Sequence, residues 1–139
     1  MIKSFINHFI ILLAPLLPIT FIRMIAGRYV AGEDHKSALK NVKELNKKGY
    51  SVTIDILGEH STNKSKSQLI TEEYIDLYNA IEANQLDCNI SIKPTHLGLD
   101  VNKNYALDNI LSLLKVAENT NNFLRIDMEN SKVTDDTID

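Results

Sequence analysis

Three short segments that alternate apolar and polar residues are the feature of this chain that most constrains its fold. They cover residues 51–57, 89–93 and 123–128, and their β-branched residues predict strands. The stretches between them carry apolar residues at helical spacing, which predicts helices over residues 67–83 and 103–119. Strands that alternate with helices in this way are typical of βαβ units and a parallel sheet.

The alternation within each strand indicates which kind of parallel sheet to expect. One face carries only apolar residues, namely Val52, Ile54, Ile56, Ile90, Ile92, Leu124 and Ile126. The other face is mostly polar and carries Thr53, Asp55, Ser91, Lys93, Arg125 and Asp127. Strands of an open α/β sheet are covered on both faces and are apolar throughout, so this pattern favours a (β/α)8 barrel with a polar lumen. Lys93 and Asp127 then lie at strand carboxyl ends, where barrel active sites are found.

The length of the chain limits how much of a barrel it can form. The predicted strands start at residues 51, 89 and 123 in a chain of 139 residues. A complete barrel has eight strands and about 250 residues. The sequence therefore predicts an α/β chain that is the N-terminal portion of a (β/α)8 TIM barrel, about three βα units long and truncated.

The N-terminal segment is a separate problem. Residues 4–22 carry no charge, and Pro15 and Pro18 interrupt them. A membrane helix needs about 20 apolar residues, and proline weakens it. Three interpretations stay open: apolar lead-in helices that pack on the domain or a partner, a membrane contact or span, and a signal peptide. We expect lead-in helices over residues 1–27 and the partial barrel over residues 28–139, with further helices over residues 34–48 and from residue 134.

Composition excludes several function classes. A net charge of −3, no Trp and 6% aromatic residues leave no basic patch or stacking platform for nucleic acid. The single cysteine, Cys88, excludes an intramolecular disulfide and fits a reducing, cytoplasmic compartment. Glu59 and His60 match no standard set of metal ligands, so we expect no metal.

Four stretches, in matching order and at matching distances, carry a family resemblance. They are Arg-Tyr-Val-Ala-Gly-Glu at 28–33, Asp-Ile-Leu-Gly-Glu at 55–59, Ser-Ile-Lys-Pro-Thr-His-Leu-Gly-Leu at 91–99 and Arg-Ile-Asp-Met-Glu-Asn-Ser at 125–131. Together they resemble proline dehydrogenase, the flavoprotein oxidoreductase of proline catabolism that converts L-proline to 1-pyrroline-5-carboxylate. The resemblance implies a TIM barrel and FAD as the cofactor.

The resemblance also implies roles for single residues. Lys93 would bind the carboxylate of proline, Asp127 would be the catalytic aspartate beside flavin and substrate, and Ile126 would contact FAD. Glu59 would form a gate ion pair with an arginine on the last helix of the barrel. A lysine at a strand end suits a carboxylate ligand, since such charged hydrogen bonds are strong. From the residues without the resemblance, the favoured interpretation of Lys93 is an interior cation balanced by Asp127 or Asp55, with no role in chemistry.

Two function classes follow from the length. The chain ends before the family's flavin-binding arginine on the fifth strand and before the paired arginines that clamp the substrate, so we expect it to be inactive by itself. It is either part of a proline dehydrogenase or a non-catalytic fragment of a split or interrupted gene. A fragment would act only through a complementary C-terminal half. In a complete protein, residues 4–22 would either pack on the barrel or lie against the inner membrane, and in the second case a peripheral enzyme would pass electrons to quinone.

Overall fold

The computed structural model describes Pro18, residues 31–32 and residues 34–139. The chain divides into two compact units, residues 1–41 and 42–139. Apart from Pro18, the apolar segment over residues 4–22 lies outside the described residues, and so does the expected boundary after residue 27. Within the described part of the chain, no helix is long and apolar enough to cross a membrane.

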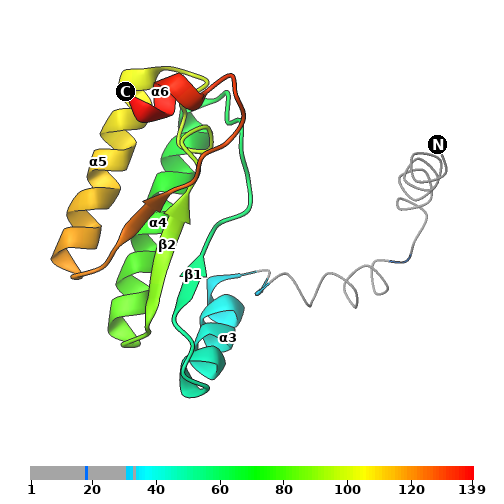
Figure 1. Cartoon of the computed structure of the whole chain (residues 1–139), viewed down its shortest axis with the longest axis vertical. Coiled ribbons are helices and arrows are strands. Elements are labelled where there is room, and N and C mark those ends of the chain that lie inside the picture. Colours follow the sequence, from blue (N-terminus) through cyan, green and yellow to red (C-terminus); the bar gives the residue numbers. More distant parts are fainter. Residues whose placement is uncertain (1–17, 19–30, 33) are drawn as a thin grey trace. The chain divides into compact units, whose positions relative to one another are not determined.

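The second unit is built on a parallel sheet of three strands. Strands β1 (Val52–Ile54), β2 (Cys88–Ile92) and β3 (Leu124–Ile126) lie in the order β1-β2-β3. Helix α4 (Lys64–Ala83) connects the first pair and helix α5 (Lys103–Asn119) the second, and the two helices pack against each other (Figure 1). The predicted strand–helix alternation and parallel pairing are confirmed.

Strand register confirms the predicted apolar face. Ile54 pairs with Ile90, and Ile90 pairs with Leu124. Ile90 and Ile92 are fully buried. The core includes four large side chains of α4: Tyr74, Leu77, Tyr78 and Ile81. Each fully buried side chain of this size contributes about 1.5–3 kcal/mol, and α4 and the central strand β2 supply the largest of the fully buried side chains.

Helix α4 begins three residues before the predicted start. Asn63 is its N-cap, and its side-chain oxygen accepts the backbone N–H groups of Ser65 and Lys66. The polar first turn faces solvent and carries no apolar periodicity, so the sequence pattern missed it. Asparagine at this position satisfies N–H groups that would otherwise lack partners.

Strands β1 and β3 are shorter than predicted because their last residues bond elsewhere. After Ile54 the chain leaves the sheet, and the backbone N–H of Ile56 donates to the Tyr74 hydroxyl at 3.4 Å. After β3, Asp127 still donates its backbone N–H to the Ile92 carbonyl at 2.9 Å, but the following residues turn away from β2 and towards the loop that follows it.

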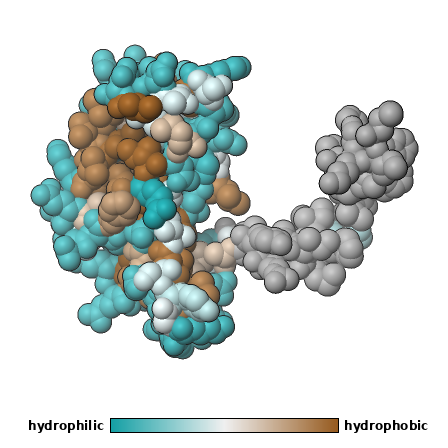
Figure 2. Space-filling view, in the orientation of Figure 1, coloured by the Kyte–Doolittle hydropathy of each residue, from teal (hydrophilic) through white to brown (hydrophobic). Residues whose placement is uncertain are grey.

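Helix α5 has the predicted bounds, and its apolar side chains are divided between the core and the surface. Its exposed apolar side chains are Leu107, Leu111 and Leu114, which are 50%, 45% and 43% exposed. Its buried residues are Ala106, Asn109, Leu113 and Ala117. Nothing in the described residues covers the three exposed leucines. Figure 2 shows apolar surface gathered on the side where α5 lies.

The remaining helices lie at the two ends of the described chain. Helix α3 (His35–Lys47) begins after Asp34, whose carboxylate accepts the Ser37 N–H at 2.7 Å. It is followed by Gly49 at φ +85°, a conformation that favours glycine. Helix α6 (Thr134–Ile138) is short. It lies near the start of α5, where Lys103 pairs with Asp136 at 3.4 Å.

Candidate functional site

The candidate site lies at the carboxyl edge of the sheet. Asp55, Lys93 and Asp127 are each the first residue after a strand, following β1, β2 and β3 respectively. Because the strands are parallel and neighbours in the order β1-β2-β3, these three side chains emerge at the same edge. All three are partly buried. The structure therefore brings Lys93 and Asp127 to one edge of the sheet, as predicted. Asp55, which follows β1, lies at the same edge.

An ion pair joins the first two strands. Lys93 Nζ donates to Asp55 Oδ2 at 2.5 Å, and the two side chains are 23% and 25% exposed. Partial burial by itself would lower the pKa of Lys93, but the hydrogen bond and charge of Asp55, helped by Asp127 and Glu59, raise it above its usual value. The Lys93 side chain is thus held in its cationic form. Of the two counter-ions that the sequence allowed, the direct partner is Asp55.

The Asp55 carboxylate is held in place by a hydrogen bond from a tyrosine of helix α4. Tyr74 donates its hydroxyl to Asp55 Oδ1 at 3.1 Å and accepts the Ile56 N–H. Its ring is fully buried, and burial, together with the negative charge of Asp55, raises the pKa of its hydroxyl. The apolar spacing over residues 67–83 predicted the helix and not this contact. A buried tyrosine hydroxyl usually has a polar partner, and that rule is the signal that could have found this contact.

Asp127 has a separate partner. Ser91 Oγ donates to Asp127 Oδ1 at 2.5 Å. Ser91 is buried and lies in β2, two residues before Lys93. The serine fixes one carboxylate oxygen of Asp127 and leaves the second for another donor.

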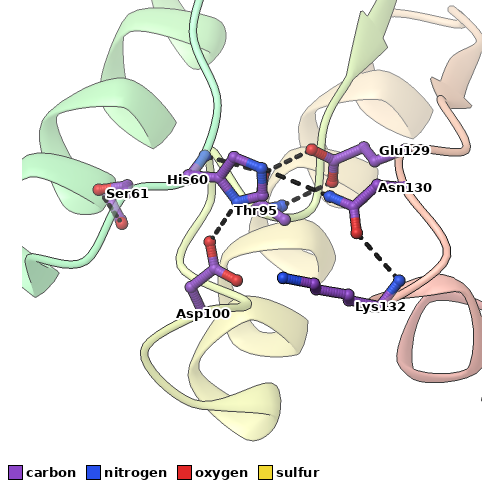
Figure 3. A network of polar contacts seen from close by, with 8 residues as sticks. His60, Ser61, Thr95, Asp100, Glu129, Asn130 and Lys132 are labelled. Atoms are coloured by element: carbon purple, nitrogen blue, oxygen red, sulfur yellow. Dashed lines mark hydrogen bonds and ion pairs between the residues drawn. The ribbon is translucent and has the colours of Figure 1, made fainter.

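The loops after all three strands are fastened together through Thr95 (Figure 3). Its hydroxyl donates to the Glu129 carboxylate, which also accepts the Thr95 N–H at 3.0 Å. The Thr95 hydroxyl oxygen accepts the backbone N–H of His60 at 3.0 Å, and its carbonyl accepts that of Ser61. Thr95 is fully buried. This arrangement, which we call the Thr95 clasp, was not predicted, because its residues are more than 30 positions apart in the sequence.

His60 adds a second connection at the surface of the same edge. Its Nδ1 lies 2.7 Å from Asp100 Oδ2, and its Nε2 lies 3.4 Å from Asn130 Nδ2. The hydrogen bond to Asp100 raises the pKa of His60 above its usual value, although slight burial opposes the shift. His60, Asp100 and Asn130 come from three different loops (Figure 3), so the protonation state of one ring affects contacts between all three.

His96, in contrast, lies inside the edge. It is 3% exposed, and its Nδ1 makes no hydrogen bond in the described part of the chain. Burial lowers the pKa of His96. Gly58 lies directly against the ring, so a side chain at that position would collide with His96. The neutral ring therefore packs as part of the loop core.

The two remaining predicted site residues lie apart from Lys93. Ile126 pairs with Ile92 in the ladder, so it belongs to the face of the sheet opposite to Lys93 and Asp127, and it is 46% exposed. Glu59 is exposed and makes no ion pair with any described residue. No group of three metal-ligand side chains occurs among the residues that the structure describes. The predicted roles of these residues stay predictions.

Comparisons with known proteins agree with the fold and with the sequence motifs. The family model of proline dehydrogenase matches residues 38–139. The chain is 39% identical to Proline dehydrogenase 1 of Bacillus subtilis subsp. natto over 107 residues, which are 77% of this chain and 35% of that protein. It is 33% identical to Proline dehydrogenase 2 of Bacillus subtilis (strain 168) over 84% of this chain and 39% of that protein.

A solved structure shows the same fold. It is proline utilization A (PutA) from Bdellovibrio bacteriovorus inactivated by N-propargylglycine, which matches with a TM-score of 0.71 and 22% identity. The match covers 78% of this chain and 14% of that one. The chain spans a little over a third of the length of the curated relatives it matches. By its sequence and its fold, this chain belongs to the proline dehydrogenase family.

Proposed function

We propose that this chain forms the first three βα units of a proline dehydrogenase barrel and contributes to the oxidation of L-proline to 1-pyrroline-5-carboxylate. The observation that carries the proposal is the cationic Lys93 at the strand edge, paired with Asp55 and flanked by Asp127. A substrate with a carboxylate and a protonated amine needs both signs of charge within reach. This edge supplies them from three neighbouring strands.

Lys93 is the residue for the substrate carboxylate. An ammonium group that is partly shielded from water binds a carboxylate more strongly than an exposed one, because the local dielectric constant is lower. Asp127, held by Ser91 through one oxygen, lies beside it as the catalytic aspartate of the proposal. Its second oxygen is placed to orient the substrate or the flavin.

The residues present fit one side of a flavin. Ile126 and Met128 are 46% and 56% exposed at the end of β3, and a planar aromatic ring packs well on such apolar surface. The polar groups Lys93 and Asp127 follow at the same strand ends. Ile126 would contact FAD at the carboxyl end of β3. When bound, the flavin accepts the hydride that proline loses, and the protein supplies orientation and charge.

The remaining barrel units are the proposed partner. Strand β3 is an edge strand, and the exposed leucines of α5 lie next to it along the chain. In a barrel each helix packs against its neighbours, so a further βα unit would cover Leu107, Leu111 and Leu114. We propose that a complementary C-terminal half supplies these units, including the arginine that would pair with Glu59 as a gate.

Residues 4–22 are the segment that we propose to contact a membrane. An uncharged segment broken by prolines suits the surface of a membrane better than a span. We propose a cytoplasmic enzyme that is peripheral to the inner membrane and passes electrons to quinone. Binding of the chain to liposomes, compared with a variant that lacks residues 1–22, tests this part by co-sedimentation.

Complementation tests the catalytic proposal. The 139-residue chain is mixed or fused with the remaining units of the B. subtilis subsp. natto relative, and flavin absorbance and proline-dependent dye reduction are measured. We expect flavin and turnover only in the combined protein. Lys93→Ala should raise its KM for proline about 10- to 150-fold, the equivalent of losing a charged hydrogen bond of about 1.5–3 kcal/mol. A combined protein that folds and binds flavin but has the same KM in both forms would remove Lys93 from the substrate site.

The alternative is a non-catalytic fragment of a split or interrupted gene. The observation in its favour is the exposed apolar face of α5, which no residue in the described part of the chain covers. Under this alternative, no combination with the remaining units restores flavin binding or turnover.

A further inference from the structure

We propose that Asp55, anchored by Tyr74, is the positioning residue that aims the Lys93 ammonium group at the carboxyl edge of the sheet. The inference rests on the proposed function for its purpose, since Lys93 is there the ligand of the substrate carboxylate. The contact itself does not depend on that function.

Geometry is the first support. Lysine has a long flexible side chain, and an exposed one adopts many rotamers. Here Lys93 Nζ lies 2.5 Å from Asp55 Oδ2, and both groups are only about a quarter exposed. The two residues come from adjacent strands of one sheet, so their backbones are fixed relative to each other and the pair has little freedom.

The anchor below Asp55 is the second support. A carboxylate positions a cation only if it is itself held in place. Asp55 Oδ1 accepts the Tyr74 hydroxyl at 3.1 Å, and the Tyr74 ring is fully buried in the core of α4 and the sheet. The hydroxyl oxygen in turn accepts the Ile56 N–H. A chain of contacts thus runs from the core through Asp55 to Lys93.

Charge is the third support. Four ionisable groups act on Lys93 from the surrounding elements: Asp55 after β1, Asp127 after β3, Glu59 in the first loop and His96 in its own loop. Asp127 is engaged by Ser91, and Glu59 is exposed. Asp55 is therefore the group that directly opposes the effect of burial and keeps the ammonium charged. A carboxylate ligand then meets a cation that is already charged and oriented, which lowers the cost of binding.

The experiment measures the reactivity of Lys93 in the full 139-residue chain. Acetic anhydride acylates only uncharged amines, and peptide mass spectrometry gives the acetylated fraction of each lysine as a function of pH. Lys115, exposed on α5, is the internal reference. Asp55→Asn keeps the size of the side chain and removes its charge. Asp108→Asn removes the same charge at an exposed position on α5 and is the matched control.

We expect the labelling midpoint of Lys93 to move to lower pH in Asp55→Asn and to stay unchanged in Asp108→Asn. Asp55→Glu should restore part of the wild-type midpoint, and Tyr74→Phe should shift it in the same direction as Asp55→Asn but less. Circular dichroism checks that each variant is folded. An unchanged Lys93 midpoint in a folded Asp55→Asn chain would overturn the proposal.

Failure of the proposed function can be distinguished from failure of the proposal for Asp55. If Asp55→Asn shifts the Lys93 midpoint while Lys93→Ala leaves the KM of the combined protein unchanged, Asp55 positions Lys93 but Lys93 does not bind the substrate. If Tyr74→Phe leaves the midpoint unchanged while Asp55→Asn shifts it, the anchoring role of Tyr74 is wrong and that part of the proposal is overturned.

Discussion

Helices α4 and α5 follow successive strands and both carry apolar residues at helical spacing, yet they are held to the molecule in different ways. Helix α4 buries Tyr74, Leu77, Tyr78 and Ile81 completely. Helix α5 buries a single large apolar side chain, Leu113, with Ala106, Asn109 and Ala117, and it exposes a stripe of leucines. A helical apolar stripe therefore identifies a face that some neighbour should cover, but that neighbour need not lie within the same three βα units. The difference shows that the apolar face of α4 is covered within these three βα units and that the leucine stripe of α5 is not covered by any described residue.

The largest expected effect comes from truncating one leucine on each helix. Leu77→Ala in α4 should lower the free energy of unfolding by about 2–5 kcal/mol, because it leaves a cavity beneath the sheet. Leu111→Ala in α5, where the side chain is 45% exposed, should change it by less than about 0.5 kcal/mol. Urea denaturation followed by circular dichroism measures both values. Equal losses would mean that α5 is packed in solution and that the comparison fails.

The second test asks what holds α5 besides the packing of Leu113, which is fully buried. Asn109 is 5% exposed, and its side-chain amide donates to the Leu97 carbonyl at 2.9 Å. Asn109→Ala should cost about 1–3 kcal/mol, because a buried carbonyl loses its partner. Asn104→Ala, at an exposed position of the same helix, should cost much less and serves as the control. The same urea titration reports both, and a neutral Asn109→Ala would mean that the buried apolar residues of α5, and not this hydrogen bond, hold the helix.

The features of the fold that depend on local geometry could be predicted from the sequence, and those that depend on contacts between elements could not. The alternation of Ile90, Ser91 and Ile92 predicted the strand and its buried face, because side-chain direction in a strand depends only on local geometry. The stripe on α5 could not be placed, since periodicity gives the face of a helix and not what covers it. The start of α4 was missed because its Asn63 cap precedes a polar first turn.

The candidate site could be predicted only in part, for a related reason. Lys93 and Asp127 were found because they follow strands and match family motifs. The Thr95 clasp and the Tyr74 hydroxyl were not, because each depends on which loop or helix meets which. A threonine and a glutamate 34 positions apart have no local pattern that pairs them. The face of Ile126, opposite to that of Lys93, was predicted from the strand alternation and is confirmed by the register.

The third prediction concerns association rather than folding. Replacing Leu107, Leu111 and Leu114 by Gln should reduce self-association of the chain and leave its urea midpoint nearly unchanged. Contiguous exposed apolar surface favours contacts between molecules, and these three side chains form one stripe. Sedimentation velocity at several concentrations measures the effect. The same replacement should also prevent the complementary barrel units from binding, and a variant that still binds them would show that the stripe is not their docking face.

The smallest expected effect concerns the two histidines of the site loops, which should respond to pH in opposite directions. Asp100 raises the pKa of His60, whereas burial lowers that of His96. With an unfolded-state value of about 6.5 for both, the contribution of His60 to stability is fully present below that pH and is lost as the pH rises through its folded pKa. The contribution of His96 is present above about pH 6.5 and is lost as the pH falls through its folded pKa. NMR titration of the ring protons, assigned with His60→Gln and His96→Gln, should give midpoints on opposite sides of 6.5. Asp100→Asn should lower the His60 midpoint and leave that of His96 in place, and identical midpoints for the two rings would contradict the contrast between an exposed loop contact and a buried one.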